Sequence, residues 1–280
     1  MKDRQRALIL TTPAALLLAV LFLLPLAIMA LYTFRAGTFG PESQQFTLDH
    51  YREFFGNSTF QRLLWRSIVL SFWVSLFTVI LAYPVAYYLA FRAGERRLLL
   101  LTIIIVPAWI SYLLRVLAWK VILGGSGLLV SLLDWAGIQT SGPILIYSAD
   151  AVIVTLVYVW VPFVALPIFA ALERIDRSLL EAAADLGCGR VEAFLRVTLP
   201  LSLPGVIAGF LFVFIPTVGE YVTPTLVGGS EGIMFGNMVF DQFLRGLNWP
   251  LGSLMSLAML VVILVPLFVA GRYVRLSEFT

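Results

Sequence analysis

The chain has 280 residues, of which 60% are hydrophobic and only 12% are charged. This composition is too apolar for a soluble domain, and the sequence predicts an all-α membrane protein. The net charge of +3 does not indicate nucleic-acid binding, because the basic residues form no patch with interleaved aromatic residues. One cysteine, Cys188, and one histidine, His50, exclude an intrachain disulfide and leave almost nothing for a zinc site or histidine-dependent catalysis.

Six apolar segments are long enough to cross about 30 Å of hydrocarbon as helices. We predict a single transmembrane domain, residues 1–280, with spans at about 7–34, 68–91, 98–122, 151–172, 206–222 and 251–274. The first segment is longer than the roughly 7–15 residues of a signal-peptide core and has no clear cleavage site, so we expect a retained helix. Between the spans we expect short helices at about 49–55 and 128–137, and an outer loop at 224–250.

Six spans place both termini on one side of the membrane. Basic residues on that side lie in both termini, the 92–97 loop and the 173–200 loop: Lys2, Arg4, Arg6, Arg92, Arg96, Arg97, Arg174, Arg177, Arg190, Arg196, Arg272 and Arg275. The opposite side holds fewer: Arg35, Arg52, Arg62, Arg66 and Arg245, with Arg115 and Lys120 near a helix end. By the positive-inside rule, the N- and C-termini and the 173–200 loop are cytoplasmic.

The polar loop 173–200 interrupts the apolar chain and predicts a helix–turn–helix. Asp176 can cap a helix that begins near Arg177, and Gly187 can end it in a left-handed conformation. A second short helix is expected at about 190–197, before Pro200. The loop is either an ordinary helical connection or a surface on which another protein docks.

The spacing within this loop resembles the EAA motif of bacterial ABC importer permeases. The matching residues are Glu181, Ala182 and Ala183, then three residues with Asp185 at their centre, then Gly187, and, after nine intervening residues, Val197, Leu199 and Pro200. The family pattern most often has Ile where this chain has Val197. The resemblance implies that the loop's short coupling helices sit in a cleft of a cytoplasmic ATPase subunit.

No Gly-x-x-x-x-Gly-Lys-Ser/Thr sequence occurs, and the only lysines are Lys2 and Lys120. We therefore expect no ATPase site in this chain and no enzyme activity, with energy arriving from a partner.

Glu220 is the clearest candidate for the substrate pathway. Pro216 and Gly219 loosen the helix around it, and a carboxylate within a membrane favours a cation. Tyr221 adds an aromatic face for cation–π contact. Alternatively, Glu220 lies at the outer interface and pairs with Arg115, or it caps a broken helix.

Three further residues are weaker candidates for contact with a cation. Trp109 and Tyr112 can stack on an ammonium group, or they can belong to an interfacial aromatic belt. Asp241 can attract cations at the outer mouth, or it can be a solvated loop residue.

From about Phe46 to Tyr273 the chain resembles the permease subunits of polyamine (spermidine/putrescine) ABC importers. The resemblance is carried by the EAA loop, residues 215–222 (IPTVGEYV), 226–229 (LVGG) and 248–250 (NWP). Related branches carry opines, amino-acid derivatives, ferric iron or thiamine, and these substrates remain alternatives. An ion-coupled secondary transporter is a rival from another class, but it requires paired inverted repeats with broken helices and several ion ligands in the membrane.

The resemblance implies the type I importer permease fold in the bacterial inner membrane. It also implies a second permease subunit, a homologue forming a heterodimer, two ATPase subunits that bind ATP and Mg²⁺, and a periplasmic substrate-binding protein. Transport would proceed by alternating access. The other expected partner is membrane lipid, and this chain is expected to hold no cofactor or metal of its own.

Overall fold

The structure, a computed structural model, describes residues 2–137 and 145–277. The side chains of residues 2–10, 270 and 273–277, including those of Lys2, Arg4, Arg6 and Arg275, lie outside the description. In this part of the chain, six helical segments are long and apolar enough to cross a membrane: Thr11–Tyr32, Ser58–Phe91, Tyr112–Trp135, Ala149–Glu173, Arg190–Val218 and Trp249–Val269.

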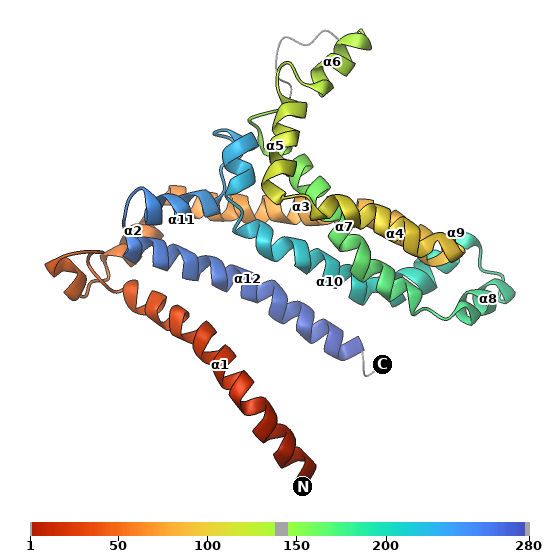
Figure 1. Cartoon of the computed structure of the whole chain (residues 1–280), viewed down its shortest axis with the longest axis horizontal. Coiled ribbons are helices and arrows are strands. Elements are labelled where there is room, and N and C mark those ends of the chain that lie inside the picture. The colour runs from red at the N-terminus through yellow and green to blue at the C-terminus, as the bar shows by residue number, and fades with distance from the viewer. Residues whose placement is uncertain (1, 138–144, 278–280) are drawn as a thin grey trace. The chain divides into compact units, whose positions relative to one another are not determined.

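The helices follow one another as Figure 1 labels them. The α-helices are α1 (Lys2–Tyr32), α2 (Asp49–Gly56), α3 (Ser58–Phe91), α4 (Arg97–Ile105), α5 (Tyr112–Leu123), α6 (Leu128–Trp135), α7 (Ala149–Glu173), α8 (Arg177–Asp185), α9 (Arg190–Ala193), α10 (Leu199–Val218), α11 (Phe235–Leu244) and α12 (Trp249–Ser277). The short 3₁₀ helices are η1 (Pro41–Gln44), η2 (Gly94–Arg96) and η3 (Val106–Trp109), and η4 (Phe194–Thr198) and η5 (Pro224–Gly228) are π-helical.

Contacts divide the chain into two compact units. One contains the chain up to Arg62 together with Met238–Val262, and the other contains Leu63–Asn237 together with the chain from Ile263 onward. This grouping by contacts does not test whether residues 1–280 form a single transmembrane domain, which stays a prediction.

In the first unit, Thr38 ties the segment after α1 to the start of α12. Its hydroxyl donates to the Leu247 carbonyl oxygen (2.6 Å) and accepts from the Trp249 backbone N–H (2.9 Å). The Trp249 ring also contacts the ring of Tyr32, with a centroid distance of 6.1 Å. Asn248 caps α12, since its side-chain oxygen accepts from the Leu251 N–H (3.2 Å). Helix α2 confirms the short helix expected at 49–55.

In the second unit, α7 and α10 lie side by side and α7 forms the centre of the core (Figure 1). Two glycines of α10 permit the close approach. A Cβ atom at Gly205 would lie 2.4 Å from the Ala171 Cβ and 2.7 Å from the Pro167 carbonyl oxygen, and one at Gly209 would lie 3.0 Å from Val164 Cγ1. Lipid tails are as apolar as the helices, so this contact depends on close packing rather than on the hydrophobic effect.

Helix α3 buries a row of hydroxyl side chains, and most of them form hydrogen bonds. Ser75 donates to the Ser71 carbonyl oxygen (2.7 Å), and Thr78 donates to that of Val74 (2.6 Å). Ser67 accepts from the Phe235 backbone N–H (2.7 Å) and so joins α3 to the start of α11. Bonds of this kind remove the cost of burying a hydroxyl group in an apolar surrounding.

The third predicted span, 98–122, is not one helix. It is divided into α4, η3 and α5, with Ile110 and Ser111 in extended conformations (ψ 141° and 133°). Pro107, near the start of η3, has no N–H to donate, so the α-helical ladder ends in this region. Helix α6 confirms the short helix expected at 128–137.

The fifth predicted span, 206–222, has different ends in the structure. Helix α10 ends at Val218, and on its other side it continues through η4 and α9 back to Arg190. The second short helix of the 173–200 loop is therefore the first part of this span rather than a separate element. Pro200 directly follows the π-helical η4, in the first turn of α10. The predicted outer loop 224–250 also contains helical segments, η5 and α11.

The α7–α10 contact predicts a test by substitution. Gly205→Ala should destabilise the protein by about 1–3 kcal/mol, because the added methyl group overpacks the contact with Ala171 and Pro167. The matched control is Gly271→Ala in α12, where the added Cβ meets nothing within 4 Å and the change should be neutral or stabilising by up to about 1 kcal/mol. Thermal unfolding of the purified protein measures both, and equal melting temperatures would contradict the close contact.

Candidate functional site

Residues 173–200, which we call the coupling loop, begin with a helix whose two ends are both capped. The Asp176 carboxylate accepts from the Ser178 N–H (3.0 Å) at the start of α8. At the other end, the Gly187 N–H donates to the Ala184 carbonyl oxygen (2.9 Å), and the Cys188 N–H donates to that of Ala183 (3.0 Å). This is the Schellman arrangement, and Gly187 has the left-handed φ of +82° that it requires. The predicted cap and glycine stop are both confirmed.

The Asp176 cap also responds to pH. The backbone N–H of Ser178, which bonds to the ionised carboxylate, lowers the pKa of Asp176 below its ordinary value. Because the folded-state pKa is lowered, the stabilising effect of the cap is present above the ordinary pKa and is lost as the pH falls through the folded-state value. At neutral pH the cap is fully formed.

The second half of the coupling loop is fixed to α3 by aromatic contacts. The Phe194 ring makes edge contacts with Tyr83 (5.7 Å between centroids) and Tyr87 (5.9 Å). The Tyr83 hydroxyl shares a hydrogen bond of 2.8 Å with Ser202 of α10. These contacts connect this part of the loop to both α3 and α10.

The tip of the loop presents small and apolar residues to solvent. Leu186 is 86% exposed and Val191 is 72% exposed. Glu181, Ala182 and Asp185 are exposed, whereas Ala183 is buried. In the first turn of α10, Leu199 is half-buried and Pro200 is exposed. A surface of this composition is typical of a place where another protein packs.

A second set of predicted residues gathers where α10 ends. We call residues 219–221 the helix break, because α10 stops at Val218 and helical structure resumes at Val222. Glu220 is half-buried, and one oxygen of its carboxylate accepts from the N–H groups of Val222 (2.8 Å) and Thr223 (3.2 Å). Glu220 therefore caps the segment that follows, as one of the alternatives for this residue expected.

Tyr112 joins Glu220 in one hydrogen-bonded cluster. The Tyr112 hydroxyl shares a short hydrogen bond of 2.5 Å with Thr223, whose N–H donates to Glu220. The other alternative, pairing with Arg115, is not found: among the described residues Arg115 forms no ion pair, and it donates to the Val159 carbonyl oxygen (3.2 Å).

Asn237 is a residue of this site that the sequence reasoning missed. Its side-chain N–H group donates to the Tyr221 carbonyl oxygen (2.9 Å) and to the Thr225 hydroxyl (2.8 Å). Its side-chain oxygen accepts from the Met234 N–H (3.0 Å). Gly236 beside it allows close approach, since a Cβ there would lie 2.5 Å from the Gly219 carbonyl oxygen. The only local signal was an amide side chain near a helix start, which is common.

The remaining candidates are Trp109, Tyr221 and Asp241. Trp109 is 81% exposed in η3. The Tyr221 side chain is partly exposed at the helix break itself. Asp241 lies in α11 rather than in a loop, within the first unit, and forms an ion pair with Arg245 (3.2 Å). Within the described residues no group of three or more His, Cys, Asp or Glu side chains is placed to hold a metal ion.

The fold and these two sites define the class of the protein. Residues 82–279 match the family described as "Binding-protein-dependent transport system inner membrane component". The chain belongs to this family, and it is a permease subunit of an ABC importer and a multi-pass protein of the inner membrane.

Individual proteins of known function or structure are also similar to this chain. The chain is 36% identical to the spermidine/putrescine transport system permease protein PotB of Escherichia coli K12 over 231 residues, which cover 82% of this chain and 84% of PotB. It is 37% identical to the PotB protein of Haemophilus influenzae over 227 residues, 81% of this chain and 79% of that protein. Among solved structures, a bacterial ABC transporter for import of the acidic polysaccharide alginate shares the fold, with a TM-score of 0.74 at 19% identity over 98% of this chain and 97% of the other.

Proposed function

We propose that this permease moves polyamines of the putrescine and spermidine class into the cytoplasm. The observation that carries the proposal is the similarity to two spermidine/putrescine permeases, which extends over about four-fifths of the chain. Permeases of this fold also serve other substrates, as the alginate transporter shows. The fold therefore does not distinguish polyamines from opines, amino-acid derivatives, ferric iron or thiamine, and the choice of substrate depends on the site and on experiment.

The charge at the helix break supports a cationic substrate. A half-buried carboxylate attracts an ammonium group more strongly than an exposed one, because the low dielectric of its surroundings screens the interaction less. The Tyr221 ring is partly exposed next to Glu220, where it can add a cation–π contact. An anionic opine would meet repulsion at the same place.

Energy for transport reaches the chain through the coupling loop. We propose that this loop docks on one of two cytoplasmic ATPase subunits, which bind ATP and Mg²⁺, so that this chain has no ATPase site of its own. The exposed side chains of Leu186 and Val191 and the capped, rigid α8 support this role. Arg97 of α4 and Glu173 of α7 form an ion pair, so the 92–97 loop and the coupling loop meet at one end of the second unit. This agrees with the charge-based placement of both loops, and of both termini, in the cytoplasm.

A complete transporter on this proposal contains a homologous second permease and a periplasmic binding protein that delivers the substrate. ATP binding closes the ATPases and opens the pathway outward, and hydrolysis resets it inward. Each step requires that substrate or nucleotide bind one conformation more tightly than the other, since a ligand shifts an equilibrium only by its differential affinity.

The substrate class is tested by ATPase stimulation of the reconstituted complex. Its binding protein is loaded in turn with putrescine, spermidine, an anionic opine and ferric iron. We expect stimulation by the two amines alone. Stimulation only by the opine or by iron would retain the importer and overturn the polyamine assignment.

The role of Glu220 is tested by two substitutions that separate charge from capping. Glu220→Gln keeps an oxygen that can accept from Val222 and Thr223 but removes the charge, so polyamine uptake should fall about 10- to 100-fold while the melting temperature stays unchanged. Glu220→Ala removes both and should lower uptake and melting temperature together. If Glu220→Gln has the same uptake constants as the native protein, Glu220 is only a structural cap and has no role in substrate binding.

The coupling role is tested at the end of α8. Gly187→Val forces a β-branched residue into a left-handed conformation at a cost of about 1–2 kcal/mol, so the loop should lose its shape and substrate-stimulated ATPase activity should collapse. Gly189→Ala is the control two residues away, where φ is −67° and an added Cβ meets nothing within 4 Å. Full stimulation in a correctly inserted Gly187→Val complex would contradict docking through this loop.

A further inference from the structure

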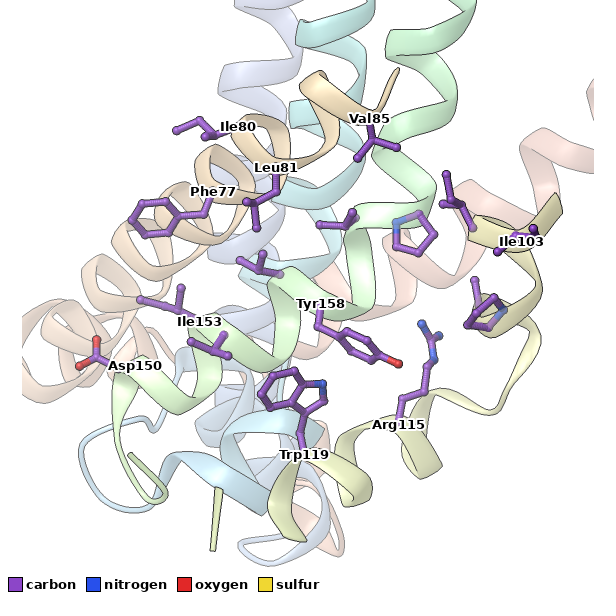
Figure 2. A pocket seen from close by; sticks show the side chains of 17 residues that line it. Phe77, Ile80, Leu81, Val85, Ile103, Arg115, Trp119, Asp150, Ile153 and Tyr158 are labelled. Atoms are coloured by element: carbon purple, nitrogen blue, oxygen red, sulfur yellow. The ribbon is translucent and has the colours of Figure 1, made fainter. Parts of the chain in front are cut away.

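A groove of about 940 Å³ lies in the second unit, apart from the helix break and the coupling loop. Helices α3, α4, α5 and α7 and the short η3 form its walls (Figure 2). Its lining is almost entirely apolar and includes Phe77, Ile80, Leu81, Ile103, Ile153 and Val154. A groove with such a lining suits hydrocarbon.

One cation stands out in this apolar lining. Arg115 of α5 faces the groove and is only 8% exposed (Figure 2). One of its terminal nitrogens donates to the Val159 carbonyl oxygen (3.2 Å), while its Nε makes no hydrogen bond to any described residue. A charged side chain within a membrane span is costly unless it is paired, and among the described residues the guanidinium group forms no ion pair.

The surroundings of Arg115 resemble the level of lipid headgroups. Trp119, one turn further along α5, contacts the Tyr158 ring of α7 with a centroid distance of 5.4 Å, and both residues line the groove. A smaller hollow of about 220 Å³ shares Arg115, Trp119 and Tyr158. Trp and Tyr gather where hydrocarbon meets headgroups.

Asp150 is the one carboxylate in the groove lining, and its place matters for the choice of ligand. It precedes Tyr158 by eight residues, which is about 12 Å along α7. At that distance it neither neutralises Arg115 nor reaches the amine of a zwitterionic headgroup whose phosphate lies on Arg115. The charge balance at the Arg115 end therefore favours a headgroup with a net negative charge.

We propose that this groove binds an anionic phospholipid of the membrane. Its acyl chains lie along the apolar lining of α3, α4 and α7, and its phosphate pairs with Arg115 beside Trp119 and Tyr158. The lipid supplies the counter-ion that Arg115 lacks among the described residues. The inference does not depend on which substrate the permease carries.

The test is native mass spectrometry of the assembled transporter taken from nanodiscs that contain equal amounts of phosphatidylglycerol and phosphatidylethanolamine. We expect the native complex to retain phosphatidylglycerol at least tenfold over phosphatidylethanolamine. Arg115→Gln should abolish the preference and Arg115→Lys should keep it. Lys120→Gln removes the same charge from the same helix outside the groove lining, and it should behave like the native protein.

A second variant keeps the test decisive if Arg115→Gln fails to fold. Val154→Trp leaves Arg115 in place but fills the groove, so the retained phosphatidylglycerol should be lost. Three results would overturn the proposal: equal retention of both lipids by the native complex, retention unaffected by Arg115→Gln, or retention unaffected by Val154→Trp. A carboxylate of a partner subunit's helix as the true counter-ion would produce the first of these.

Discussion

The hydrogen bonds that close the helix break are the constraint on which the functional part of the structure depends. Backbone groups freed inside a membrane have no water to bond with, so each must find a partner in the protein. Glu220 satisfies two N–H groups of the segment that follows the break, and Asn237 satisfies the Tyr221 carbonyl oxygen. These same bonds hold a carboxylate in a fixed place between two helical segments, so the residue that we propose for the substrate pathway is also a structural part of the helix break.

Close packing of α7 against α10 holds in place the helix that leads to the break. Gly205 and Gly209 bring the two helix backbones together, and Tyr83 and Ser202 connect α10 to α3. In lipid this geometry has to come from shape and hydrogen bonding. A rigid α10 fixes the orientation of the residues at both of its ends.

Sequence reasoning found what length, composition and local chemistry determine. Long apolar runs identified the spanning helices, and Asp176 and Gly187 cap α8 as expected because capping depends only on near neighbours. Prolines were ambiguous: Pro84, Pro162 and Pro167 lie within continuous helices, whereas Pro107 stands where one is interrupted. Whether a helix continues past a proline depends on whether residues distant in sequence can bond the freed backbone groups. The role of Asn237 could not be predicted for the same reason, since its acceptor, the Tyr221 carbonyl oxygen, lies 16 residues away in the sequence.

The continuity of α9, η4 and α10 has a mechanical consequence. The 29 residues from Arg190 to Val218 make one rod of about 43 Å that begins at the turn of the coupling loop and ends at the helix break. If the rod pivots where Gly205 packs on α7, about 20 Å from Val218, a tilt of about 5° moves that end by about 2 Å. The α7 contact at Gly205 and Gly209 is a natural fulcrum, because the two helices approach most closely there. A rotation imposed on the coupling loop is therefore transmitted to the residues beside Glu220 without much loss of amplitude.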